Sequence, residues 1–110
     1  MILKKQKRVN YKESNFVYLL TTEDNKQKNI YIIGKATNLQ ERLSTYNKTC
    51  EHEVVYYRSC ENEEHMDISK KIILNKLNKY REKANRDRFI LPDEEDIKLF
   101  INIINKCVDF

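Results

Sequence analysis

The chain has 110 residues, 40% of them hydrophobic, and carries a formal net charge of +4. This length allows one domain with a modest core, and no apolar run approaches the length of a membrane span. The Lys-rich N-terminus has no apolar stretch behind it, which excludes a visible signal peptide. We therefore expect an intracellular protein, cytoplasmic or nuclear, that makes no membrane contact.

Cysteine and histidine usage also excludes two classes of small domain. The three cysteines are an odd number without close pairing, which argues against a disulfide framework: Cys50, Cys60 and Cys107. No Cys-x-x-Cys or Cys/His cluster indicates zinc. We interpret His52 and His65, 13 residues apart, as two surface histidines.

Taken in chain order, residues 1–13 are predicted to be a flexible basic arm and residues 14–110 a single domain. The run Phe16–Leu20 predicts a strand, Thr21–Lys28 a polar loop, and Ile30–Gly34 a second strand. Gly34 is the only glycine of the chain. A glycine that closes an apolar strand lets the backbone turn or approach a ligand such as phosphate closely.

The next segment predicts a helix that carries an arginine. Thr37 and Gln40 have the spacing of a capping box, so a helix should begin at about Asn38, with a buried face made by Leu39, Leu43 and Tyr46. Arg42 lies at the edge of that face. A cation near a strand end and a helix N-terminus is well placed to hold a phosphate.

The second half predicts one more strand and two helices. Glu53–Arg58 is β-branched and aromatic, as in a strand, and Asn62–Lys83 has the apolar periodicity of a long helix. The connector Asn85–Leu91 follows, in which Phe89–Leu91 could form a brief strand. Pro92 is expected to open a final helix, whose core face is Ile97, Phe100, Ile101, Ile104 and Val108. The predicted fold class is α+β, a small three-stranded, mainly antiparallel sheet flanked by helices.

The charge distribution points to a partner. Basic residues crowd the first dozen positions and residues 70–88, whereas acidic residues gather before the last two predicted helices, where the helix dipole favours negative charge. The basic clusters are therefore less neutralised than the net charge implies, which favours a nucleic-acid partner. The alternative is a Lys-rich, solvated surface on a protein-interaction module.

The order strand, loop, strand ending in glycine, and helix with arginine resembles the GIY-YIG nuclease superfamily. Phe16-Val17-Tyr18 stands where that family has Gly-Ile-Tyr, and Ile32-Ile33-Gly34 where it has Tyr-Ile-Gly. The string from Asn29 to Leu43 is similar to the branch of viruses and phages often found beside KilA-N DNA-binding domains. The resemblance covers residues 15–91 and implies a metal-dependent endonuclease that hydrolyses phosphodiester bonds in DNA, with double-stranded DNA as the expected partner.

The resemblance also implies site residues. The catalytic candidates are Tyr18, which would accept a proton or orient the water, Tyr31, and Arg42, which would hold the scissile phosphate. The candidates for phosphate or nucleic-acid contact are Gly34, Lys35, Lys70, Arg86 and Arg88. An active site of this type would use Mg²⁺ or Mn²⁺, and a degenerate one no cofactor.

Two positions depart from the family pattern. The second motif tyrosine should stand at Ile32, and because neighbours on a strand face opposite sides, Tyr31 reaches the site only if a bulge re-aims it. The family's metal-binding glutamate falls at Lys70, and an ammonium cannot ligate Mg²⁺. Asp67, one helical turn away, or Glu64 could replace it.

Three hypotheses therefore follow from the sequence. The first is an endonuclease, the second a DNA-binding domain that keeps Arg42 but has lost the metal site, and the third a protein-interaction module. Asp87, in the connector, matches an acidic position of the viral branch, or else is a loop acid paired with neighbouring arginines. The apolar last residue, Phe110, and the missing recognition domain are what a fragment of a longer protein would show.

Overall fold

The structure, a computed structural model, describes residues 15–82 and 87–109. These residues form, in chain order, β2 (Phe16–Thr21), α1 (Glu23–Gln27), β3 (Ile30–Ala36), α2 (Leu39–Tyr46), β4 (Glu53–Ser59), α3 (Glu63–Lys76), a 3₁₀ turn (Asn78–Tyr80), β5 (Arg88–Ile90) and α4 (Lys98–Val108). The predicted α+β class is confirmed. The predicted basic arm, residues 1–13, lies outside the described residues. None of the helices within them combines the length and apolarity needed to span a membrane.

The sheet has four strands in the order β4-β2-β3-β5, and every neighbouring pair is antiparallel. The predicted three-stranded sheet left out β5, which overlaps the brief strand considered at Phe89–Leu91, is only three residues long and pairs with the first half of β3. β2 lies at the centre, and all six of its residues are buried. A strand covered on both faces reads as a continuous apolar run, as Phe16-Val17-Tyr18-Leu19-Leu20 does.

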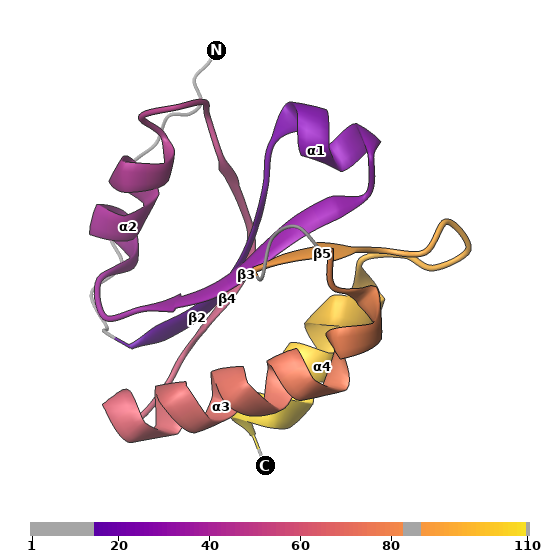
Figure 1. Cartoon of the computed structure of the whole chain (residues 1–110). Helices are drawn as coiled ribbons and strands as arrows, with labels where there is room; N and C mark the ends of the chain where they lie inside the picture. The colour runs from indigo at the N-terminus through magenta and orange to yellow at the C-terminus, as the bar shows by residue number, and fades with distance from the viewer. Residues whose placement is uncertain (1–14, 83–86, 110) are drawn as a thin grey trace.

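Two apolar layers cover the sheet, one on each face (Figure 1). On one face, alternate strand residues such as Val17, Leu19 and Ile33 pack with buried residues of α3 and α4. On the other face, Phe16, Tyr18, Leu20, Ile32 and Ala36 pack with α2. Since side chains alternate along a strand, one-residue spacing decides which layer a side chain enters.

The outer edge of β3 is only partly covered. β5 pairs with Ile30, Tyr31 and Ile32, and Ile33 N donates to the Asp87 carbonyl at 3.0 Å. Beyond that point, within the described part of the chain, β3 has a strand neighbour only on its β2 side. Gly34 and Lys35 therefore lie at a sheet edge, with α2 on one face of the sheet and α3 on the other.

The segment predicted as a polar loop after β2 contains the short helix α1, so that prediction is wrong. Thr22 caps this helix, since its hydroxyl accepts a hydrogen bond from Asn25 N at 3.0 Å. Glu23 and Asp24 in the first turn suit the helix dipole. The chain then leaves α1 through Asn29, whose φ of 61° is tolerated by asparagine.

Other predicted helix boundaries also need correction. α2 begins where expected, but its cap is Asn38 itself, which accepts from Glu41 N, and not Thr37. The long helix ends at Lys76 instead of Lys83 because Arg81 takes an extended conformation and bridges to Phe89. A chain paired with a strand there cannot continue as a helix.

The last helix does not open at Pro92. Pro92 begins a turn, in which its carbonyl accepts from Glu95 N at 3.0 Å, and α4 starts only at Lys98. The Asp96 carboxylate accepts from Lys98 N at 2.7 Å and so satisfies a free donor at the helix start. The predicted core face holds, with Phe100, Ile104 and Val108 buried and Ile97 and Ile101 packed against the same cluster.

Candidate functional site

Gly34 and Tyr18 are direct cross-strand partners on β3 and β2. The Tyr18 ring lies over Gly34, so that a Cβ atom at position 34 would be 2.3 Å from the phenol oxygen and 2.5 Å from Cζ. The backbone of Gly34 is not in the left-handed region. The glycine is therefore required by space for the tyrosine ring, not by a turn.

Arg42 meets the hydroxyl of that tyrosine. Its Nη1 donates to Tyr18 Oη at 3.4 Å, and the hydroxyl of Tyr46, one turn further along α2, lies 3.4 Å from the same oxygen. Among the described residues, no carboxylate forms an ion pair with Arg42. The exposed guanidinium thus keeps donors available for an external anion.

The Tyr18 hydroxyl is held in its neutral form. Burial of the ring raises the pKa of Tyr18 well above its ordinary value, the hydrogen bond with Tyr46 adds to this, and the charge of Arg42 only partly opposes it. The phenol therefore keeps its proton at neutral pH. In this state it can orient a water molecule or donate a hydrogen bond to a phosphate oxygen.

Two lysines extend the positive charge along the sheet edge. Lys35, next to Gly34, forms an ion pair with Asp67 of α3, and Lys70, one turn further on, lies 3.6 Å from the Asp87 carboxylate. The pKa of Lys70 is lowered, chiefly by burial and also by the positive charges of Lys35 and Arg42. Three cations therefore share one region of the surface.

These residues do not fit a divalent metal ion. A magnesium site takes oxygen ligands, usually carboxylates, but the α3 side chain whose pKa responds to the charge of Arg42 is a lysine, Lys70. Asp67 and Asp87 are each already paired with a lysine. No group of three or more His, Cys, Asp or Glu side chains in residues 15–82 and 87–109 is arranged to hold a metal.

The structure does not bring the remaining candidates to the centre of the site, by which we mean Tyr18, Gly34 and Arg42 with Lys35 and Lys70. Tyr31 belongs to the opposite layer, where its ring packs edge-to-face with Phe100 at 6.1 Å; the pairing of β2 with β3 is regular, so no bulge turns it round. Glu64 is exposed in the first turn of α3, and within the described part of the chain it forms no ion pair with Arg42, Lys35 or Lys70. Arg88 is half-buried and donates to Asn25, and Arg86 lies outside the described residues.

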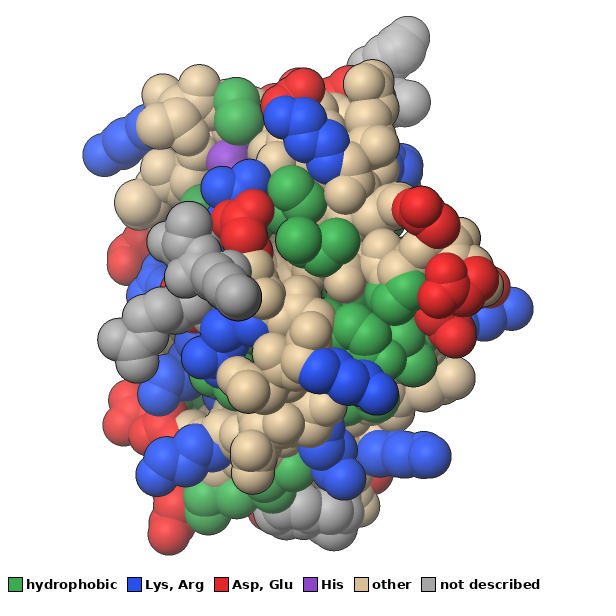
Figure 2. Space-filling view, turned by 45° about the vertical axis from the view of Figure 1, so that its right-hand side comes forward, with side chains coloured by type: hydrophobic (Ala, Val, Ile, Leu, Met, Phe, Trp, Pro, Cys, Tyr) green, Lys and Arg blue, Asp and Glu red, His purple; other side chains and the backbone are tan. Residues whose placement is uncertain are grey.

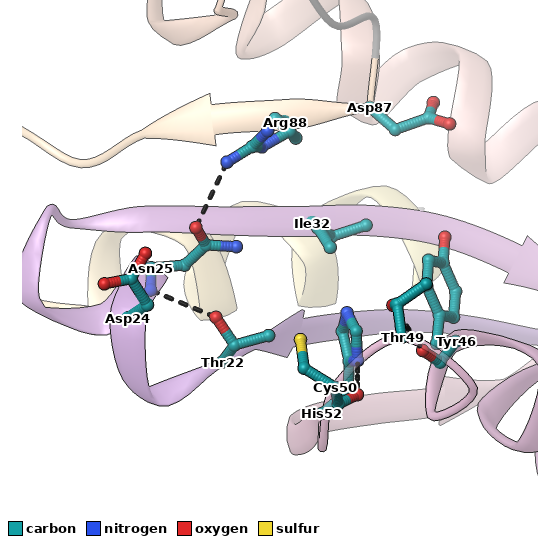
Figure 3. Close-up of a pocket in the computed structure, with 10 residues that line it drawn as sticks. All are labelled: Thr22, Asp24, Asn25, Ile32, Tyr46, Thr49, Cys50, His52, Asp87 and Arg88. Carbon is teal, nitrogen blue, oxygen red and sulfur yellow. Dashed lines mark hydrogen bonds between the residues drawn. The ribbon is translucent and has the colours of Figure 1, made fainter.

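A pocket of about 390 Å³ opens beside the centre, on the same side as Tyr46 (Figure 3). Its walls come from four separate segments, and its lining is Thr22, Asp24, Asn25, Ile32, Tyr46, Thr49, Cys50, His52, Asp87 and Arg88. This pocket was not predicted from the sequence, and His52, interpreted there as a surface histidine, is partly exposed and lines it. No local pattern could have indicated it, because tertiary folding assembles it.

Surface charge alone does not mark the site. On the face drawn in Figure 2, lysine and arginine side chains are interspersed with acidic and apolar ones and form no continuous patch. The geometry around Tyr18 and Arg42, and not the net charge, singles out this edge of the sheet.

Fold and site together define a class: an antiparallel α+β domain in which a tyrosine and an arginine meet over a glycine at the sheet edge. The chain belongs to the T5orf172 domain family, whose profile matches residues 15–110. This domain occurs in phage proteins and is related to nuclease-like folds. No curated protein and no solved structure matches the chain.

Replacing Gly34 by alanine is expected to lower the free energy of unfolding by about 1–3 kcal/mol, because the new methyl group overlaps the Tyr18 ring. Urea unfolding measures this loss. The control is the same substitution in a Tyr18→Leu background, where the ring is gone and the cost should shrink. An equal cost in both backgrounds would show that the ring is not the reason for the glycine.

Lys70→Glu should create a metal site, since it places a third carboxylate beside Asp67 and Asp87. With Mn²⁺ at ten times its Kd, the variant should gain about 1.4 kcal/mol of stability, visible as a rise in Tm. The wild-type protein and Lys71→Glu, which has the same charge change at an exposed position, should show no such rise. A metal-dependent rise in the wild-type protein would contradict our interpretation of the site.

Proposed function

We propose that this chain is a DNA-binding domain of GIY-YIG type that holds a backbone phosphodiester at Tyr18 and Arg42. The observation that carries the proposal is the 3.4 Å contact between the Arg42 guanidinium and the Tyr18 hydroxyl, on an arginine with no carboxylate ion pair among the described residues. A planar, permanently charged guanidinium can donate two parallel hydrogen bonds to a phosphate.

The neighbouring lysines support phosphate as the ligand. Lys70 is only 17% exposed and lies close enough to Lys35 and Arg42 for their charges to lower its pKa. A bound phosphate would relieve the repulsion among these three cations, and positive groups around a backbone phosphate supply most of the non-specific affinity for DNA. Double-stranded DNA is the partner that we expect, inside the cell.

In this proposal, binding does not depend on Mg²⁺ or Mn²⁺. The position at which the resembled family carries a metal-binding glutamate holds Lys70, whose ammonium contacts the phosphate in place of a metal. The domain then corresponds to the second hypothesis drawn from the sequence, a DNA-binding domain that keeps Arg42 but has lost the metal site.

Phosphodiester hydrolysis is the second candidate. It is favoured by the position of the Tyr18 hydroxyl, which both Arg42 and Tyr46 contact and which could orient a water molecule beside a bound phosphate. Against it stands the raised pKa of Tyr18, which keeps the phenol protonated, so that this hydroxyl is poorly suited to take a proton from the water.

Arg42→Ala should weaken DNA binding at every sequence and reduce the slope of log K against log[salt] by about 1, because one phosphate contact is lost. For the wild-type protein, if about six phosphates are neutralised, affinity should fall by about 10³-fold between 50 and 200 mM salt. Fluorescence anisotropy with a labelled duplex measures both.

Lys106→Ala on α4 is the matched control, since it removes an exposed charge outside the site and should change little. Arg42→Lys should recover only part of the affinity, because it keeps the charge but not the forked geometry. If the wild-type protein binds no nucleic acid at low salt, the protein-interaction alternative replaces this proposal.

Supercoiled plasmid tests the second candidate. We expect the wild-type protein to retard the plasmid in a gel without nicking it, whether Mg²⁺, Mn²⁺ or a chelator is present. Cleavage that needs a metal and is lost in both Arg42→Ala and Asp67→Ala would instead establish a nuclease. Loss of a positioned donor such as Arg42 would then cost about 3–4 kcal/mol of transition-state stabilisation.

A further inference from the structure

The pocket beside Tyr46 has the size and lining of a small-molecule site. Its volume of about 390 Å³ is within the range of ligand pockets. Ile32, 8% exposed, lies at its base, and the rings of Tyr46 and His52 stand along one side with their centroids 5.0 Å apart (Figure 3). A flat aromatic ligand would find apolar and aromatic surface here.

Hydrogen bonds fix the direction of two polar groups in the pocket. Arg88 Nη2 donates to Asn25 Oδ1 at 3.1 Å, so the amide oxygen is already used. The amide nitrogen must then be the other end of the side chain, and in Figure 3 it is turned toward Ile32. No hydrogen bond from it is found within the described part of the chain. Asn25 thus offers a fixed donor to the pocket.

His52 offers the complementary group. Its Nδ1 lies 2.8 Å from the Cys50 carbonyl, and because a carbonyl only accepts, Nδ1 carries the proton. In the neutral ring, Nε2 is then an acceptor, and Figure 3 shows this nitrogen also on the side of Ile32. A donor and an acceptor therefore approach the apolar base of the pocket from two different segments.

The pocket is continuous with the phosphate site. The Tyr46 hydroxyl is 3.4 Å from that of Tyr18, while the Tyr46 ring lines the pocket. Asp87 also lines the pocket and, on its other side, forms the ion pair with Lys70. A nucleotide joins a phosphate to a flat ring bearing donors and acceptors, which is the combination that these adjacent sites present.

We propose that this pocket receives an unstacked nucleobase of the strand whose phosphate lies at Arg42, with Asn25 donating to the base and His52 accepting from it. The inference rests on the proposed phosphate site. Base recognition by an aromatic wall and a few polar groups requires a base that is free of its stack. The base comes either from a single strand or from a duplex opened at a mismatch.

The first experiment compares two single-stranded oligonucleotides of equal length, one with bases and one made of abasic sugars. The wild-type protein should bind the base-bearing strand about tenfold more tightly, as expected for one stacked base. Equal affinity for the two would overturn the proposal. Arg42→Ala should lower the affinity for both strands by the same factor. If it lowers the affinity for neither strand, the proposed phosphate site at Arg42 is wrong.

Asn25→Asp is the sharpest variant, because it keeps an acceptor for Arg88 but removes the donor. It should abolish the preference for the base-bearing strand. Gln27→Glu is the matched control: it adds the same charge to the same helix at an exposed position that does not line the pocket, and the preference should survive. Loss of the preference in both variants would mean that charge, and not the pocket, is responsible.

Chemical protection locates the base directly. Cys50 lines the pocket and is exposed, whereas Cys60 and Cys107 are buried, so alkylation of the folded protein reports on Cys50. Saturating base-bearing strand should slow this reaction, and the abasic strand should not. Unchanged alkylation with saturating base-bearing strand would overturn the proposal. Repeating the measurement with a matched and a mismatched duplex distinguishes the two sources, since only an opened duplex should protect.

Discussion

The packing of the Tyr18 ring over Gly34 is the constraint on which the site depends. It places a buried phenol across the central pair of strands and brings its hydroxyl to the edge where α2 passes. A side chain at position 34 would occupy the space of the ring, so the only glycine of the chain and this tyrosine are required together. The side chain of Asn38 caps the start of α2, and Arg42, in the first turn of this helix, then lies within hydrogen-bonding distance of the hydroxyl.

Electrostatics give this centre its chemical character. Arg42, Lys35 and Lys70 are close enough to influence one another, while Asp67 and Asp87 balance the lysines but not the arginine. A region with surplus positive charge, a neutral phenol and no cluster of free carboxylates suits a phosphate oxygen better than a metal ion. Nucleic-acid binding therefore follows more directly from these residues than hydrolysis does.

Local patterns in the sequence predicted the three longer strands and α2, because strand alternation and helix capping are short-range effects. They also indicated that Tyr31 would face away. The grouping of Tyr18, Gly34 and Arg42 in one site was instead implied by the family resemblance. Local patterns failed for α1, whose five residues are too few for helical periodicity, and for the end of α3, which depends on the bridge from Arg81 to the distant β5. The pocket could not be predicted from local patterns either, because its walls come from segments that are far apart in the sequence and meet only in the folded chain.

The shortness of β5 has a consequence for self-association. Among residues 15–82 and 87–109, no strand pairs with the second half of β3 on the side of β5, and such sheet margins invite pairing with strands of other molecules. Here that margin carries Lys35, and a charged side chain on an open edge opposes an incoming apolar strand. The cation that favours a polyanionic ligand therefore also protects the protein from aggregating along this edge.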